Sequence, residues 1–425
     1  MDASLQVAPR CKLRARALSL LLPWVFFISA EARASSSLRS SPSPPLLAST
    51  QLAGQAADAP SPALEDQIHE ALAQGKSDVA RKLLPMFLGE PNVLAEALLR
   101  TGADLAQHEM FEEAGEVFAR CVANNPGLFE AYYNLALAQL ASRKYSEALA
   151  TISKAPHSSP DYEVARTYLR GKIELALRQN AEAERDLGAA FAAAPQIENY
   201  ALDLGLAYLI SRKYQQAIDV FKKGVSYQGG SPFLLLGLGL AQFLGGQSAE
   251  SIETCHSLLS LQPDFSPVRV LLAFDLIMEG DASQASQVAA QGLQDANPFP
   301  YLYYIHAAAL LKEQSKDYAG ILKDLAQAER GIPGCALCYL SSSKAHQKMG
   351  ERDAATADLE QAIKLDPTLA EAWYRLASLY DEQGRHTEAQ QARRHFGELK
   401  ENKANRDTEM LRDAFLKSLG LAGSP

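Results

Sequence analysis

The stretch AEAWYRLASLYDEQGRHTEA, residues 370–389, decides the fold because its skeleton also stands 34 residues upstream. The upstream copy is ALCYLSSSKAHQKMGERDAA, residues 336–355. An aromatic residue, a glycine and an alanine recur in register, as Tyr339 and Trp373, Gly350 and Gly384, and Ala355 and Ala389. Similarity at a fixed interval is the signature of a repeat architecture, in which each unit needs its neighbours to bury its apolar face.

Two markers extend the repeat along most of the chain. A small residue, replaced once by isoleucine, recurs at intervals of 34 to 36 residues: Ala80, Ala114, Ala148, Ala183, Ala217, Ser251, Ala285, Ile321, Ala355 and Ala389. A proline near the end of most units keeps the same phase: Pro91, Pro126, Pro160, Pro195, Pro263, Pro298, Pro333 and Pro367. Because the two markers stay in phase, we predict an array of ten repeats.

Each unit predicts two helices. In residues 129–162, mostly apolar side chains recur at the i, i+3, i+4, i+7 spacing of one face of an amphipathic helix: first Tyr132, Leu135, Ala136 and Gln139, then Tyr145, Ala148, Leu149, Ile152 and Ala155. Arg143 and Lys144 are expected to form the turn between the helices, and Pro160 is expected to end the second one. No stretch sustains the alternation that a strand requires.

This skeleton resembles that of the tetratricopeptide repeat family. Residues 198–231 carry its pattern of large and small side chains most fully, as Leu204, Gly205, Tyr208, Tyr214, Ala217, Phe221 and Gly224. The resemblance implies an all-α fold, a right-handed superhelical solenoid of about ten helix–turn–helix repeats. Small residues at the eighth position, such as Gly171 and Gly239, are expected where two helices approach closely. Ile321 and Phe396 depart from the pattern, because the family has small residues there.

The repeats predict the domain organisation. Residues 1–34 have a basic start, an apolar run and Ala-Arg-Ala at their end, which indicates a cleaved signal peptide, with an uncleaved anchor as the alternative. Residues 35–60 are rich in Ser, Pro and Ala and are expected to be a flexible linker. The array is predicted over residues 61–403, with units 61–94, 95–128, 129–163, 164–197, 198–231, 232–265, 266–301, 302–335, 336–369 and 370–403. Residues 404–425 are expected to hold a capping helix, Thr408–Gly420, and a tail.

The sequence excludes several function classes. The formal net charge of −9 argues against non-specific binding to nucleic acid or to anionic membranes. No phosphate-binding loop, His-Glu-x-x-His or Gly-x-Ser-x-Gly motif occurs, and the repeats leave no room for a catalytic domain. We therefore expect no enzyme activity, no catalytic residue and no cofactor.

The family resemblance implies that the first helices line a concave groove. The positions that would face it are apolar through the middle units: Tyr133, Leu137, Leu140, Leu202, Leu206, Leu209, Phe233, Leu236, Leu240, Phe243, Val270, Phe274, Ile277, Tyr303, His306 and Leu310. Contiguous exposed apolar surface usually marks a binding site. Two interpretations stay open: these residues bind a helix or an extended segment of a partner, or they only pack first helix against first helix.

Cys335 and Cys338 lie at the start of a predicted helix. A local disulfide, two unpaired cysteines, or a redox or metal site are the alternatives. Zinc would need two more ligands, and we expect no metal. Cys121 and Cys255 occupy packing positions and are expected to be reduced and inert.

We conclude from the sequence that the chain is a non-catalytic scaffold or adaptor of the cell envelope, periplasmic or extracellular, whose groove binds other proteins. One alternative is a structural subunit of an envelope or secretion complex that acts by self-association. Another is a redox or metal protein that uses Cys335 and Cys338. No nucleic acid is expected as a partner, nor a membrane span in the mature chain.

Overall fold

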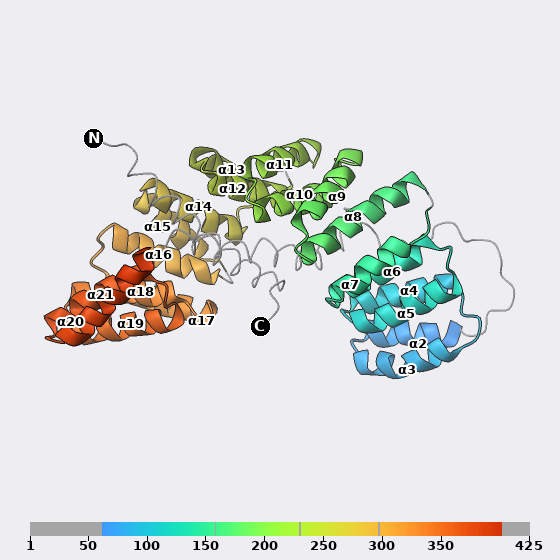
Figure 1. Ribbon diagram of the computed structural model, residues 1–425, viewed down its shortest axis with the longest axis horizontal. Coiled ribbons are helices and arrows are strands. Elements are labelled where there is room, and N and C mark those ends of the chain that lie inside the picture. Colours follow the sequence, from blue (N-terminus) through green and yellow to red (C-terminus); the bar gives the residue numbers. More distant parts are fainter. Residues whose placement is uncertain (1–61, 158, 229–230, 296–297, 402–425) are drawn as a thin grey trace. The chain divides into compact units, whose positions relative to one another are not determined.

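The computed structural model describes residues 62–401, apart from residues 158, 229–230 and 296–297. The described residues form 20 helices and no strand, so the predicted all-α class is confirmed for them (Figure 1). The predicted signal peptide, linker and capping helix lie outside the described residues. None of the described helices is long and apolar enough to cross a membrane.

The chain divides into two compact units, with the boundary between residues 212 and 213. The described part of the N-terminal unit contains α2 (Pro62–Ala73), α3 (Ser77–Gly89), α4 (Ala95–Gln107), α5 (Phe111–Asn124), α6 (Phe129–Ala141), α7 (Tyr145–Lys154), α8 (Pro160–Ala176), α9 (Asn180–Ala193) and α10 (Glu198–Ile210).

The described part of the C-terminal unit contains α11 (Tyr214–Gln228), α12 (Pro232–Gly245), α13 (Ser248–Leu261), α14 (Ser266–Glu279), α15 (Ala282–Gly292), α16 (Pro300–Lys312), α17 (Tyr318–Gly331), α18 (Ala336–Met349), α19 (Arg352–Leu365), α20 (Ala370–Glu382) and α21 (His386–Glu401).

Helices pack by the same rule in both units. A first helix contacts its own second helix and also the first helix of the next pair, as α6 contacts α7 and α8, and α14 contacts α15 and α16. Each pair therefore buries one face within itself and another against its neighbour, which is how repeats too small to fold alone become stable.

The ten small residues that define the repeat lie in the core. All of them, from Ala80 to Ala389, have an exposed fraction of 0%, including Ser251 and the exceptional Ile321. Helices also pack closely at the eighth position of the repeat, for example at Gly171. A Cβ added there would lie 2.9 Å from Cγ of Leu187 and 3.0 Å from its backbone nitrogen, closer than real Cβ contacts.

The turn between the two helices of each pair has one backbone geometry throughout. Its central residue has a positive φ in all ten pairs: Gly75, Glu109, Arg143, Arg178, Arg212, Gly246, Gly280, Gln314, Gly350 and Gly384. The amide of the next residue bonds back five residues, for example from Lys144 to the carbonyl of Gln139 at 2.8 Å and from Glu351 to that of His346 at 2.9 Å. This is the left-handed ending that glycine adopts without steric penalty.

Pro160 does not end a helix, contrary to the sequence prediction. The helix α7 ends earlier, at Lys154, and Pro160 opens α8 instead. Pro232 and Pro300 likewise stand in the first turns of α12 and α16. Proline fits there because the first amides of a helix have no partner within it, so the missing N–H removes no hydrogen bond.

Candidate partner-binding surfaces

The sixteen predicted inner-face residues divide evenly by burial. Eight are buried: Tyr133, Leu206, Leu209, Leu236, Leu240, Phe243, Val270 and Phe274. Eight are half-buried: Leu137, Leu140, Leu202, Phe233, Ile277, Tyr303, His306 and Leu310. Six of the sixteen belong to the N-terminal unit and ten to the C-terminal unit. The half-buried side chains are the ones that can touch a partner without a rearrangement of the core.

In the C-terminal unit these residues stand on strongly apolar helices. Every residue of α12 from Leu234 to Leu244 is buried, and so is every residue of α14 from Val270 to Leu276. Residues 231–300 contain one Lys or Arg, Arg269. Among the predicted inner-face residues, the half-buried apolar side chains of α12, α14 and α16 are Phe233, Ile277, Tyr303 and Leu310, which we call the apolar set.

His306 is held by its own repeat. Its Nδ1 lies 2.6 Å from a carboxylate oxygen of Asp324 on α17, and both side chains are about four-fifths buried. His346 and Asp358 make the equivalent pair between α18 and α19, at 2.7 Å. These pairs join the two helices of one repeat, so His306 serves packing within its pair.

The N-terminal unit carries a polar network at related positions of its first helices. The hydroxyl of Tyr168 donates to Asp203, and Nζ of Lys172 lies 3.2 Å from the same carboxylate. The rings of Tyr168 and Tyr200 are 4.3 Å apart. The network therefore links α8 to α10 through one buried carboxylate.

Tyr133 on α6 also belongs to this polar region. It is fully buried, and its hydroxyl has no hydrogen-bond partner. Burial, together with the nearby Tyr200 and Asp203, raises the pKa of Tyr133. The sequence pattern assigns Tyr133 and its neighbours to an apolar face and misses the network, although Tyr168 and Asp203 stand about one repeat apart.

A second charged cluster lies between α8 and α9. Arg170 pairs with Asp186, which also accepts from Arg185 at 3.0 Å, and Arg170 lies 3.9 Å from Glu174. Glu174 is buried, and one of its carboxylate oxygens has no hydrogen-bond partner. Burial and the negative charge of Asp186 raise the pKa of Glu174 to about 7.

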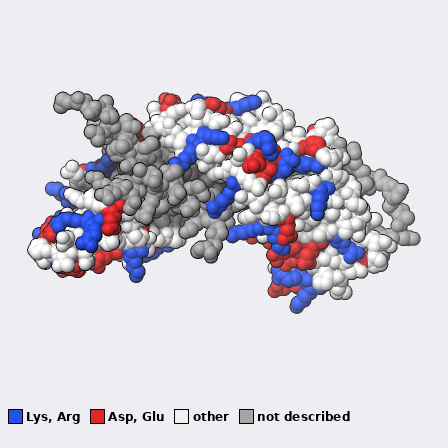
Figure 2. All heavy atoms as spheres, viewed as in Figure 1, with Lys and Arg blue, Asp and Glu red and all other residues white. Residues whose placement is uncertain are grey.

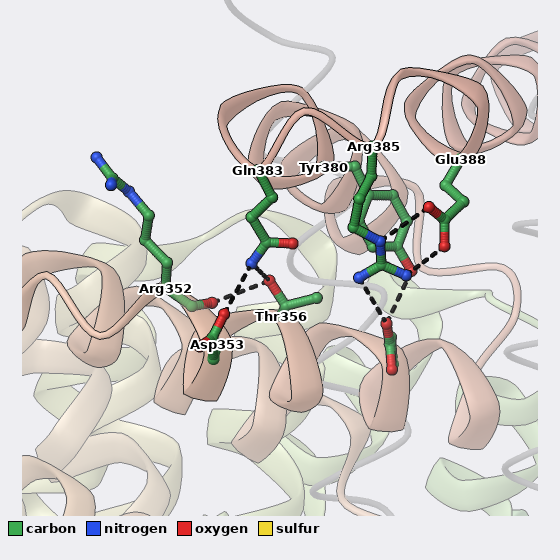
Figure 3. Close-up of polar contacts among 8 residues, drawn as sticks. Arg352, Asp353, Thr356, Tyr380, Gln383, Arg385 and Glu388 are labelled. Atoms are coloured by element: carbon green, nitrogen blue, oxygen red, sulfur yellow. Dashed lines mark hydrogen bonds and ion pairs between the residues drawn. The ribbon is translucent and has the colours of Figure 1, made fainter.

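Polar contacts also join consecutive repeats at the end of the C-terminal unit. Figure 3 shows the amide nitrogen of Gln383 between Asp353 and Thr356 of α19, at 3.3 and 3.0 Å. Arg385 lies over the ring of Tyr380, 4.1 Å from its centroid, and pairs with Glu388. These side chains are engaged with one another, so we assign them to packing within and between repeats.

The structure joins Cys335 and Cys338 by a disulfide at the start of α18. The sulfur of Cys335 also accepts a hydrogen bond from the amide of Cys338, at 3.2 Å. Cys121 and Cys255 are free and buried, and burial raises the pKa of both thiols, to about 11 for Cys121, which disfavours the reactive thiolate. Within residues 62–401 as described, no group of three or more His, Cys, Asp or Glu side chains is placed to hold a metal ion.

Comparison with known proteins identifies the repeat. Family models described as tetratricopeptide repeat match residues 105–173, 168–233, 336–369 and 359–391. No curated protein sequence matches the chain.

Solved structures give distant likenesses. One is a tetratricopeptide repeat protein from Parabacteroides merdae, 18% identical, with a TM-score of 0.46, covering 59% of this chain and 98% of that one. Another is pilF of Pseudomonas aeruginosa, 17% identical, with a TM-score of 0.42, covering 49% of this chain and 93% of its own. A third is MamA, 20% identical, with a TM-score of 0.35, covering 39% of this chain and 96% of its own.

Proposed function

The chain is a tetratricopeptide repeat protein, a fold suited to protein–protein interaction, and from this premise we propose that it is a non-catalytic scaffold of the cell envelope. Its C-terminal unit binds an apolar segment of a partner protein through the apolar set, Phe233, Ile277, Tyr303 and Leu310. The fold alone does not decide this, because one fold hosts many functions.

One observation carries the proposal. The apolar set lies half-buried on the first helices of three neighbouring repeats, within residues 231–311, which contain a single Lys or Arg, Arg269. Half-buried apolar side chains that recur over three first helices leave apolar area for a partner to cover, which supports a binding role. A partner helix or extended segment would bury them, and burial of apolar area supplies the affinity.

The test is a binding measurement with a fluorescent amphipathic peptide of Leu and Ser on the full chain. We expect Ile277→Ser with Leu310→Ser to weaken binding at least tenfold while the helix content stays unchanged in circular dichroism. The matched control is Leu261→Ser on α13, an apolar side chain that is 58% exposed but lies outside the apolar set. Equal binding by the double variant and the unaltered chain would refute the proposal.

The envelope location rests on residues 1–34, whose basic start, apolar run and Ala-Arg-Ala ending suit export. In a bacterial host that exports it, we expect the mature chain in the envelope fraction to begin at Ser35 by N-terminal sequencing. A chain that keeps Met1 and stays in the cytosolic fraction would refute the envelope location. The proposal that the chain binds a partner would be unaffected.

A further inference from the structure

The turns of the N-terminal unit contain an unusual choice of residue. Three consecutive turns place arginine at the positive-φ position: Arg143 (φ 60°), Arg178 (φ 63°) and Arg212 (φ 58°). An L side chain in this conformation brings its Cβ close to the following carbonyl oxygen, which glycine avoids. The same turn holds glycine in five of the ten pairs, so the backbone accepts glycine and the fold does not require arginine.

The three arginines lie along one edge. They follow α6, α8 and α10, which run in the same direction and pack side by side in that order. The C-terminal ends of the three helices therefore meet at the same edge of the unit. Neighbouring packed helices are about 8–10 Å apart, so the three side chains form a row with roughly that spacing.

The row is basic and exposed. Arg143, Arg178 and Arg212 are all exposed, as is Lys144, which follows the first of them. Acidic groups nearby are Glu112, whose carboxylate lies 3.6 Å from Nζ of Lys144, and Glu147 and Glu182 in the first turns of α7 and α9.

The sign of this row is opposite to the net charge of the chain. The chain as a whole carries a formal charge of −9. Acidic side chains gather over the α3–α5 end of the face in Figure 2, and both signs are present over α8 to α10. A row of arginines at positive-φ positions supplies positive charge in an acidic protein, and backbone outliers of this kind often mark functional sites.

The guanidinium groups of the three arginines indicate the chemical class of the ligand. Their planar donors bind carboxylates in a two-pronged geometry, more specifically than lysine does. An extended peptide in the polyproline II geometry has three residues per turn and advances about 3.1 Å per residue, so carboxylates three residues apart lie on one face at a spacing of about 9 Å. We propose that Arg143, Arg178 and Arg212, which belong to the N-terminal unit and not to the unit of the apolar set, bind an extended acidic segment of a partner protein.

The test uses the full chain and a fluorescent peptide with glutamate at every third residue among serine and glycine. We expect the triple variant Arg143→Gly, Arg178→Gly and Arg212→Gly to bind it at least tenfold more weakly. Its unfolding temperature should stay the same or rise, because glycine fits the turn. This combination separates a binding role from a structural one, which would lower the unfolding temperature.

The matched control replaces the other two non-glycine turn residues, as Glu109→Gly with Gln314→Gly, and should leave peptide affinity unchanged. A peptide with glutamine in place of glutamate should bind poorly, and raising the salt concentration should weaken the glutamate complex. Unchanged affinity in the arginine triple variant would overturn the proposal. So would equal binding of the glutamine peptide, or arginine-dependent binding of DNA or anionic vesicles with none of the peptide.

Discussion

The two units repeat one helix pair but fill equivalent positions differently. Four of the five turns in the N-terminal unit hold Glu or Arg where four of the five in the C-terminal unit hold Gly. The first helices of the N-terminal unit share a carboxylate among tyrosines and a lysine, whereas α12 and α14 are apolar almost throughout. The repeat therefore constrains the ten small core residues and the turn geometry, and leaves the other positions open to function.

The largest expected effect is on the polar network of the N-terminal unit. Asp203→Ala removes the carboxylate that accepts from Tyr168 and pairs with Lys172, which leaves both without that partner in a mostly buried site. We expect a loss of about 3 kcal/mol in the free energy of unfolding, measured with urea. Hydrogen exchange should quicken in α8 and α10 and stay unchanged in α12 to α21.

Asp203→Asn is the control, because it keeps an acceptor for Tyr168 and removes only the charge. It should lose less stability than Asp203→Ala. Equal losses for the two variants would mean that the ion pair with Lys172, and not the hydrogen bond, dominates the network.

Close packing at the eighth position gives the next effect. Helix propensity alone favours alanine over glycine by about 1 kcal/mol. At Gly171, however, the added Cβ would lie 2.9 Å from the side chain of Leu187 and 3.0 Å from its backbone, so overpacking should win and cost about 1–2 kcal/mol net. Gly188→Ala in α9 is the matched control, since a Cβ added there meets no neighbouring side chain within 4 Å, and it should stabilise the chain. Stabilisation by both variants in urea unfolding would contradict the close approach.

Two carboxylates, buried Glu174 and the more exposed Glu371, should respond to pH in opposite directions. The pKa of Glu174 is raised to about 7 by burial and by Asp186, so the folded state holds the proton more tightly and gains stability as the pH falls from about 7 towards 4.5. Glu174→Gln should therefore be more stable than the unaltered chain at pH 8, with the advantage gone at pH 4.5. Urea unfolding at both pH values measures it.

Glu371 in the C-terminal unit is the counterpart. Partial burial opposes its charge, but Lys344 at 3.0 Å and Arg375 at 2.9 Å more than offset this, so the pKa of Glu371 is lowered. Its ionised form stabilises the fold above about pH 4.5, and that stability is lost as the pH falls through the lowered pKa. Glu371→Gln should be less stable at pH 7, with a difference that shrinks in acid. A constant difference would show that the carboxylate charge is irrelevant.

The sequence predicts the scaffold well because packing leaves a periodic trace. Each of the ten marker residues, including Ile321, is a core residue, and a small side chain such as Gly171 marks a close helix contact. The prediction for Pro160 is wrong because the same residue type suits the end of one helix and the start of the next. The bond from Tyr168 to Asp203 joins neighbouring repeats through particular rotamers, which no periodic pattern records, and the strain at Arg178 is visible only in the backbone.

The smallest effect tests the turns themselves. Gln314 is the exception among the glycine turns of the C-terminal unit, with φ of 59°. Gln314→Gly should stabilise the chain by about 0.5–1 kcal/mol, and Gly350→Gln should destabilise it by a similar amount, because only the side chain changes while the turn stays the same. Thermal unfolding measures both. If both variants lose stability, the glutamine side chain contributes to the fold and the turns are not equivalent. If the shifts are equal and opposite, the two turns are equivalent, and glycine is the residue that the turn geometry itself favours.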